Sequence, residues 1–323
     1  MGELDVDALR HAVAAENAAW VPRDSELLRL PQQQQRRRLG LRTDPGRLRW
    51  LREQPQPDVG RLIAETAVGT ERGERGTLLE VTLRAATAAS ALRREVERLT
   101  EVAPWFLRWL FHVDWRDRFG LQAVTPVRDQ GACGSCVAFA AVAVLESMLV
   151  IERNHASDLS EAELLFCGGG GCDGWWPDHA IDYAGDRGIA QESCFPYQAH
   201  DMPCQPCPRR DGEAIKITRT TTLFDVEQRK DYLAFVGPMM GAFVVHSDFY
   251  GYSSGVYSHV TGEALGGHCV EVVGYDDFLG CWICKNSWGA AWGDAGFFQI
   301  AYGQCEIDST YPFWGMSGTE WWS

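Results

Sequence analysis

The chain has 323 residues, of which 46% are hydrophobic and 23% charged, an ordinary composition for a globular protein long enough to form two domains. Its net charge of −14 is unevenly distributed: residues 1–111 hold 18 Arg, no Lys and 16 acidic residues, a balance of +2, which leaves −16 for residues 112–323. The acidic excess argues against nucleic-acid binding, which requires a basic surface, and no stretch reaches the length of a membrane span. The two parts could attract each other at close range, or they could be separately solvated surfaces.

All eleven cysteines lie after residue 132. An odd number in one region predicts paired disulfides together with free thiols, which favours a secreted or extracytoplasmic location. The opening residues MGELDVDALRH are acidic and polar and do not read as a secretory signal, so the sequence leaves the compartment open.

Residues 1–111 are expected to be mainly helical. Apolar residues recur at helical spacing between Leu4 and Trp20, and a second run of helix formers, LLEVTLRAATAASALRREVERL, covers residues 78–99. Pro and Gly interrupt the stretch between them. The segment contains one His and no Cys, so we interpret it as an accessory or regulatory region.

From Val113 the pattern changes. An unbroken apolar helix signal runs from Cys136 to Arg153. β-rich runs follow at residues 215–222, 241–245, 269–274, 280–285 and 296–302. Helices followed by strands predict an α+β domain with two lobes.

The first motif that points to chemistry is QGACGSC, residues 130–136, which leads directly into that helix. A cysteine at a helix N-terminus lies at the positive end of the peptide dipoles, which lowers its pKa and favours the thiolate. A single Cys such as Cys136 is more often a buried core residue, but the flanking pattern favours a nucleophile.

Two later motifs supply the partners that a thiol nucleophile needs. GGHCVEVVGY places His268 at the start of a strand, where its ring can act as the base. KNSWG places Asn286 so that its amide can hold the imidazole in one tautomer, with Trp288 shielding that hydrogen bond. Alone, such a His would more often be a packing residue and such an Asn a turn residue.

Together the three motifs resemble the papain family of cysteine peptidases. They occur in the family's order, His268 following Cys136 by 132 residues and Asn286 following His268 by 18. Further matches are VDWR at 113–116, LSEAEL at 159–164 and FPY at 195–197. The resemblance implies a two-lobed papain-like fold over residues 112–323, a helical lobe and a β-rich lobe with the active site between them.

Carried over residue by residue, the resemblance implies that Cys136 is the nucleophile and His268 its proton partner. Asn286 would orient His268, and the Gln130 side chain would complete an oxyanion hole with the Cys136 N–H. Such an enzyme hydrolyses peptide bonds through an acyl-enzyme and requires no metal or cofactor.

The same alignment implies a set of substrate-binding residues: Gly174, Trp175, Trp176, Ala242, Gly266, Gly267, Cys269, Thr310 and Trp288. Most would line an uncharged pocket suited to an apolar side chain, and the Gly267 carbonyl would bond the substrate backbone. Trp175 departs from the pattern, since the family usually has Gly there. Its indole could narrow the groove, or it could point to solvent and change nothing.

The resemblance also implies a Cys133–Cys172 disulfide and one from Cys167 to Cys204 or Cys207. Cys194 could take the remaining member of that pair. Cys284 is expected to be a buried thiol, and Cys281 is a candidate partner for Cys305. Three CxxC pairs raise zinc as an alternative. Because one pair contains the nucleophile and another lies in a strand, where residues three apart face opposite sides, we expect no metal site.

Family members commonly carry an inhibitory N-terminal propeptide. Residues 1–111 occupy that place, although the family's usual propeptide helix motif cannot be aligned, so we expect an intramolecular inhibitor released between Glu101 and Trp115. A docking domain is the alternative. We expect a monomeric endopeptidase acting on peptides or proteins, without nucleic-acid or membrane partners. A peptide ligase using the same acyl-enzyme and an inactive binding module are the competing functions.

Overall fold

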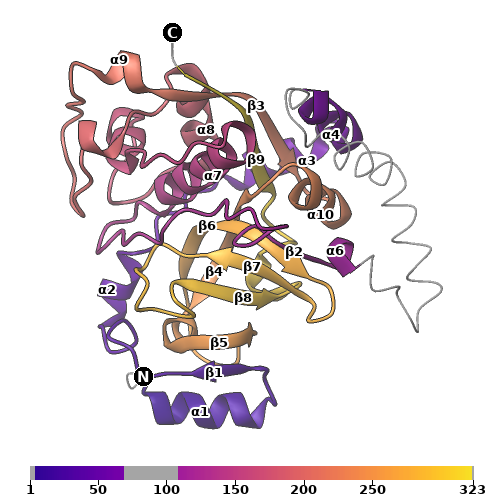
Figure 1. Ribbon diagram of the computed structural model, residues 1–323. Helices are drawn as coiled ribbons and strands as arrows, with labels where there is room; N and C mark the ends of the chain where they lie inside the picture. Colours follow the sequence, from indigo (N-terminus) through magenta and orange to yellow (C-terminus); the bar gives the residue numbers. More distant parts are fainter. Residues whose placement is uncertain (1–3, 69–107, 322–323) are drawn as a thin grey trace.

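The structure is a computed structural model that describes residues 4–68 and 108–321. The expected helix over residues 78–99, and the part of the expected release region before residue 108, lie outside the described residues. Figure 1 shows helices gathered around α7 in one part of the molecule and strands in the other, so the expected two-lobed α+β architecture is confirmed. No helix within 4–68 or 108–321 is both long and apolar enough to cross a bilayer.

The helical lobe is built around α7, Cys136–Arg153, whose bounds match the sequence prediction. All residues from Cys136 to Leu149 are buried, which explains why this helix has no polar face. It ends at Asn154, which adopts the left-handed conformation that commonly terminates helices. The shorter helices of this lobe are η2 (Glu163–Cys167), α8 (Pro177–Asp186), η3 (Glu192–Cys194) and α9 (Arg210–Glu213).

The other lobe is a sheet in the order β1-β5-β8-β7-β6-β4-β9-β3, with β2 also pairing with β6. The strands are β1 (Trp20–Pro22), β2 (His112–Asp114), β3 (Ile215–Leu223), β4 (Met239–His246), β5 (Tyr252–Tyr257), β6 (Ala264–Asp276), β7 (Cys281–Lys285), β8 (Phe297–Ala301) and β9 (Phe313–Trp321). Every strand expected from the sequence is present; β1, β2, β5 and β9 are additional. Flanking elements are α6 (Arg108–Phe111), α10 (Val226–Phe235), η4 (Ser247–Gly251) and η5 (Gln304–Glu306).

The N-terminal segment folds against the sheet. Its helices are α1 (Val6–Ala15), α2 (Gln32–Arg36), α3 (Pro45–Glu53) and α4 (Val59–Val68). Figure 1 shows α1 and β1 beside β5. β1 pairs antiparallel with β5 and forms an edge strand of the sheet. Trp20 donates its indole N–H to the carbonyl of Ser258 at 2.9 Å, and Leu9 is fully buried against Gly251. The segment therefore docks through its own apolar side chains.

The disulfides are Cys133–Cys172, Cys167–Cys204 and Cys194–Cys207. The implied pairings are thus confirmed, and Cys284 is a buried free thiol. The suggested Cys281–Cys305 pairing is wrong, because both thiols are free. Cys281 is buried in β7 opposite Ala301, whereas the Cys305 side chain lies against the Tyr257 hydroxyl.

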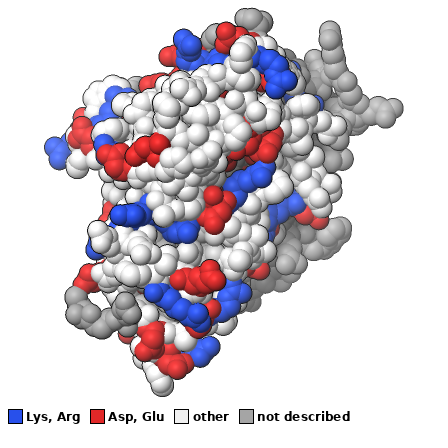
Figure 2. Space-filling model, turned by 90° about the vertical axis from the view of Figure 1, so that its left-hand side faces the viewer, with Lys and Arg blue, Asp and Glu red and all other residues white. Residues whose placement is uncertain are grey.

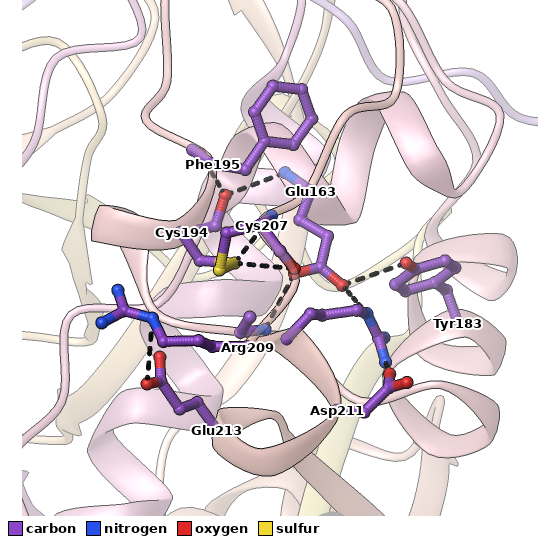
Figure 3. Close-up of a disulfide and its surroundings, with 11 residues drawn as sticks. Glu163, Tyr183, Cys194, Phe195, Cys207, Arg209, Asp211 and Glu213 are labelled. Atoms are coloured by element: carbon purple, nitrogen blue, oxygen red, sulfur yellow. Dashed lines mark hydrogen bonds and ion pairs between the residues drawn. A yellow bond between two sulfur atoms is a disulfide. The ribbon is translucent and has the colours of Figure 1, made fainter.

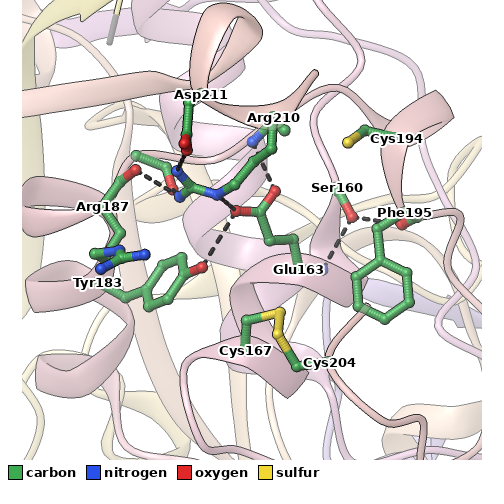
Figure 4. Close-up of polar contacts among 12 residues, drawn as sticks. Ser160, Glu163, Cys167, Tyr183, Arg187, Cys194, Phe195, Cys204, Arg210 and Asp211 are labelled. Carbon is green, nitrogen blue, oxygen red and sulfur yellow. Dashed lines mark hydrogen bonds and ion pairs between the residues drawn. A yellow bond between two sulfur atoms is a disulfide. The ribbon is translucent and has the colours of Figure 1, made fainter. Parts of the chain in front are cut away.

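A buried ion pair ties the disulfide-linked loops to the helical lobe. Arg210 donates through Nε to Glu163 Oε1 at 2.6 Å, and Glu163 also accepts from the Tyr183 hydroxyl and the Ala190 N–H (Figure 4). Figure 3 shows the region of the Cys194–Cys207 disulfide, which also contains Glu163 and the more exposed Arg209–Glu213 pair. Glu163 has no solvent-exposed side-chain surface, so its charge depends on these partners.

We expect Glu163→Gln to lower the free energy of unfolding by about 3 kcal/mol, because it removes the buried counter-ion of Arg210 and leaves only the exposed Asp211 carboxylate, 3.0 Å from Arg210, to balance the charge. Urea denaturation measures this. The matched control is Glu213→Gln, which removes an exposed ion pair and should cost less than about 0.5 kcal/mol. Equal effects of the two substitutions would contradict the assignment.

Candidate active site

Three elements of the two lobes carry the candidate catalytic residues. Cys136 is the first residue of α7, His268 lies in β6, and Asn286 directly follows β7. The His268 Nε2–H donates to Asn286 Oδ1 at 2.8 Å, which leaves Nδ1 as the free lone pair. The Trp288 ring lies 4.9 Å from the His268 ring, so it covers this hydrogen bond. The arrangement is that of a base held in one tautomer.

Gln130 lies beside the nucleophile and is held from both ends. Its Oε1 accepts from the Ser287 hydroxyl at 2.6 Å, and its Nε2 donates to the Cys133 carbonyl at 2.7 Å and to the Arg38 carbonyl at 3.0 Å. An amide donor that is fully buried and fixed in this way is suited to stabilise an oxyanion. Ser287 was not singled out from the sequence, because only the fold brings it to Gln130.

Residues 38–42, with the sequence RLGLR, pass between the two lobes in front of Cys136. The Trp175 N–H donates to the Gly40 carbonyl at 2.8 Å, and the Arg42 N–H donates to the Trp175 carbonyl at 2.9 Å. On the other lobe, the Leu41 N–H donates to the Gly267 carbonyl at 3.2 Å. The segment is therefore bound as an extended peptide by backbone groups of both lobes.

Gly40 is in direct contact with the backbone of Gly134, two residues before Cys136. A Cβ at this position would lie 1.7 Å from the Gly134 carbonyl oxygen and 2.3 Å from its carbon, so only glycine fits. The Gly40 N–H donates towards the Cys136 sulfur. The group that faces the nucleophile is thus a hydrogen-bond donor rather than an electrophilic carbonyl carbon.

The covered dyad is electrically neutral. Burial raises the pKa of the Cys136 thiol to about 11, against the opposing effect of the backbone N–H groups of Cys269 and Gly40. Burial also lowers the pKa of His268 to about 4; the hydrogen bond with Asn286 opposes this, and the nearby charge of Arg38 adds to it. His268 Nδ1 has no hydrogen-bond partner among the described residues. At neutral pH this form therefore holds a thiol and an uncharged imidazole.

We expect alkylation of Cys136 in the full-length chain to be slow at pH 7. Since thiolate is the reactive form and the pKa of Cys136 is about 11, the rate should rise about tenfold per pH unit between pH 7 and 10. Iodoacetamide labelling with mass-spectrometric assignment of the labelled cysteine measures this. A rate that is already high and constant between pH 5 and 7 would show that the thiolate–imidazolium pair persists beneath the segment.

Three Arg–Asp pairs join residues 38–47 to the rest of the chain. Arg38 pairs with Asp129 at 3.1 Å and Arg47 with Asp178 at 2.9 Å. Arg42 pairs with Asp173 and also donates to the Asp173 carbonyl. Figure 2, which shows the left-hand side of Figure 1, displays Lys or Arg side chains beside acidic ones across this face. The opposite charge of the two parts of the sequence was a signal for such pairs, but it did not identify their members.

Four of the other residues expected to bind substrate, Gly174, Trp176, Gly266 and Gly267, contact residues 38–42, whereas the contacts of Ala242 and Thr310 are with β6 and α3. Gly174 faces the Gly40 carbonyl, Leu39 and Leu41 lie against Gly266 and Gly267, and Ala242 pairs with Cys269 across β4 and β6. The Arg42 guanidinium lies 5.2 Å from the Trp176 ring centroid, and the Thr310 carbonyl accepts from Arg52 at 3.3 Å. Gly134, Asp129 and Asp173 belong to the same surroundings and were not predicted from the sequence.

The Trp175 side chain differs from both expectations. Its indole is 1% exposed and lies against Gly168 and Gly170, where a Cβ would come within 2.7 Å of the ring. It therefore neither narrows the site nor points to solvent; the two glycines provide space for it inside the helical lobe. Only the Trp175 backbone faces the segment.

Comparisons with known proteins find similarity over the part of the chain that carries this site. A family model described as papain family cysteine protease matches residues 111–313. Mouse pro-cathepsin H is 36% identical over 203 residues, 59% of this chain and 60% of that protein, and cathepsin B-like CP2 of Giardia intestinalis is 34% identical over 212 residues, 60% and 70% of the two chains. The chain thus spans about 60% of the length of the mouse relative.

Solved structures extend the likeness in fold to the N-terminal segment. Procathepsin B S9 from Trypanosoma congolense superposes with a TM-score of 0.72 at 22% identity, covering 98% of this chain and 99% of that one. Digestive procathepsin L 3 of Tenebrio molitor gives a TM-score of 0.67 at 22% identity, covering 97% and 88%. At this identity the likeness concerns the fold alone.

Proposed function

Because this chain belongs to the papain family of cysteine proteases, we propose that it is a cysteine endopeptidase in its inhibited precursor form. The observation that carries the proposal is the peptide already bound in the site. Residues 38–42 lie between the lobes with a carbonyl on the Gln130 amide and backbone bonds to Trp175 and Gly267. A site that binds one extended peptide backbone across a buried cysteine is suited to bind another as substrate.

In the open enzyme, a substrate carbonyl carbon takes the place in front of Cys136. His268 accepts the thiol proton through Nδ1, the thiolate attacks, and the developing oxyanion is held by Gln130 and the Cys136 N–H. His268 then protonates the leaving amine, and water, deprotonated by His268, releases the acyl group. Asn286 keeps Nδ1 directed at the reacting atoms throughout. All these groups belong to the chain itself.

The N-terminal segment inhibits in two ways. It fills the substrate site, and it presents the Gly40 N–H rather than a carbonyl carbon to Cys136, so that it cannot be attacked at this position. It also desolvates the dyad and places the Arg38 charge near His268, which disfavours the imidazolium. Inhibition would end when residues 38–42 leave the site.

The proposal is tested by incubating a diverse peptide pool with a full-length chain opened by Gly40→Ala and with the same chain carrying Cys136→Ala as well. Mass spectrometry should find new fragments with the first protein only. Joined or cyclised peptides would instead establish a ligase. An unchanged pool, despite selective alkylation of Cys136 in the opened chain, would refute a general peptidase.

A further inference from the structure

The segment that occupies the site has a sequence that reads the same in both directions, Arg38-Leu39-Gly40-Leu41-Arg42. Reversing an extended chain preserves the alternation of side chains between its two faces. A peptide of this sequence that runs the opposite way would therefore place the same side chains in the same positions. The pairing with Trp175, which is parallel for Leu41, becomes antiparallel, so that the leucine at this position bonds Trp175 through its own N–H and C=O.

Reversal also changes what Cys136 meets. In the bound segment, the Gly40 N–H is directed at the sulfur. In a peptide that runs the opposite way, the carbonyl carbon of the central glycine takes the place of the Gly40 nitrogen, and this carbon is the atom that a thiolate attacks. The bond that is cleaved would then follow the glycine, with the next leucine in the position of Leu39.

Both arginines of the segment lie against an aspartate. Arg42 pairs with the Asp173 carboxylate, donates to the Asp173 carbonyl and lies over the Trp176 ring. Arg38, on the other side of Gly40, pairs with Asp129 and is only 12% exposed. Once the segment has left, both carboxylates lose these partners within a domain whose net charge is −16.

We infer that the enzyme selects basic peptides, with Asp173 and Trp176 recognising Arg or Lys three residues before the cleaved bond and Asp129 recognising one two residues after it. Leucine on either side of the bond would lie on Gly267 and Gly266, where the bare backbone leaves room for it. The favoured substrate is then Arg-Leu-Gly-Leu-Arg, cut after the glycine. This specificity rests on the proposed function.

The test uses the full-length Gly40→Ala chain and internally quenched peptides that contain Arg-Leu-Gly-Leu-Arg, Ala-Leu-Gly-Leu-Ala or Glu-Leu-Gly-Leu-Glu, together with the two peptides that keep a single Arg. Each rate is divided by the concentration of protein whose Cys136 can be alkylated, so that only opened molecules are counted. We expect kcat/KM to be about tenfold higher for the doubly basic peptide than for the alanine peptide, and lower again for the acidic one. The preference should weaken as salt is raised.

Variants test which arginine of the peptide each acidic residue recognises. Asp173→Asn should reduce the Arg-over-Ala ratio only for the first Arg, and Asp129→Asn only for the second. Asp186→Asn, which removes the same charge at the exposed end of α8, should alter neither ratio. Equal cleavage of all peptides, or preference for the acidic one, would overturn the inference while leaving the peptidase intact. No cleavage of these peptides or of the diverse pool would overturn the proposed function itself.

Discussion

The Gly40→Ala variant of the full-length chain should hydrolyse peptides at least about tenfold faster than the unmodified chain, because each 1.4 kcal/mol by which closure is weakened increases the open fraction tenfold. The added Cβ would lie 1.7 Å from the Gly134 oxygen and 2.7 Å from the Gly134 Cα, atoms that belong to rigid backbone next to the Cys133–Cys172 disulfide. The overlap can be relieved only if the segment moves away from Cys136.

Two measurements separate this effect from a general loss of stability. Alkylation of Cys136 at pH 7 should accelerate together with hydrolysis, whereas the thermal unfolding of the helical lobe should change little. The matched control is Gly60→Ala, the same substitution at an exposed position of α4. Its activity should equal that of the unmodified chain. If Cys136 were alkylated in Gly40→Ala at the same rate as in the unmodified chain, the role given to this glycine would be contradicted.

The features predicted best from the sequence are those determined by residues close together along the chain. The helix Cys136–Arg153 has the predicted bounds because a continuous apolar run between a tight turn and Asn154 admits few other structures. His268 and Asn286 are joined by a hydrogen bond, and the backbone N–H of Cys269, next to His268, is directed at the Cys136 sulfur. Each of the three residues lies in its own short motif at the end of a regular element. Such features depend on neighbours within a few residues.

Four strands were not predicted. β1 and β2 are only three residues long, and the sequences of β5 and β9 interrupt the alternation that marks a strand. β9 contains Gly315 and Gly318, which weaken the signal yet are required by the fold. A Cβ at Gly315 would lie 2.5 Å from the Tyr232 ring, and Gly318 has a φ of 71°. The reason for each glycine is a contact with a distant residue or a local conformation that a pattern cannot show.

The occupant of the site was likewise beyond the reach of the sequence. Nothing local distinguishes RLGLR from the Arg-rich stretch around it; its role depends on Gly134, Trp175 and Gly267, which lie more than ninety residues away. The same holds for the Trp175 indole, whose space inside the lobe is left by Gly168 and Gly170. Charge asymmetry predicted that the two parts could attract each other, but only the fold shows which Arg meets which Asp.

The Cys136→Ala substitution in the opened Gly40→Ala chain should lower peptide hydrolysis at least about 10⁴-fold, because removing the nucleophile of a coupled catalytic set abolishes covalent catalysis and leaves only binding and oxyanion stabilisation. Burial of Cys136 is complete in the closed form, yet the substitution removes only one sulfur atom. Thermal unfolding should therefore show a folded protein, so that the loss is one of chemistry.

Two other thiols make this test discriminating. Cys269 donates its backbone N–H towards the Cys136 sulfur and carries a free thiol of its own, whose pKa is raised by burial and by the neighbouring Cys136. If Cys269 could act as nucleophile, the Cys136→Ala chain would keep measurable turnover that a thiol reagent removes. Cys305→Ala, the matched loss of a free thiol beside Tyr257, should retain full turnover. Retained activity in Cys136→Ala, or its loss in Cys305→Ala, would each place the chemistry elsewhere than at the N-terminus of α7.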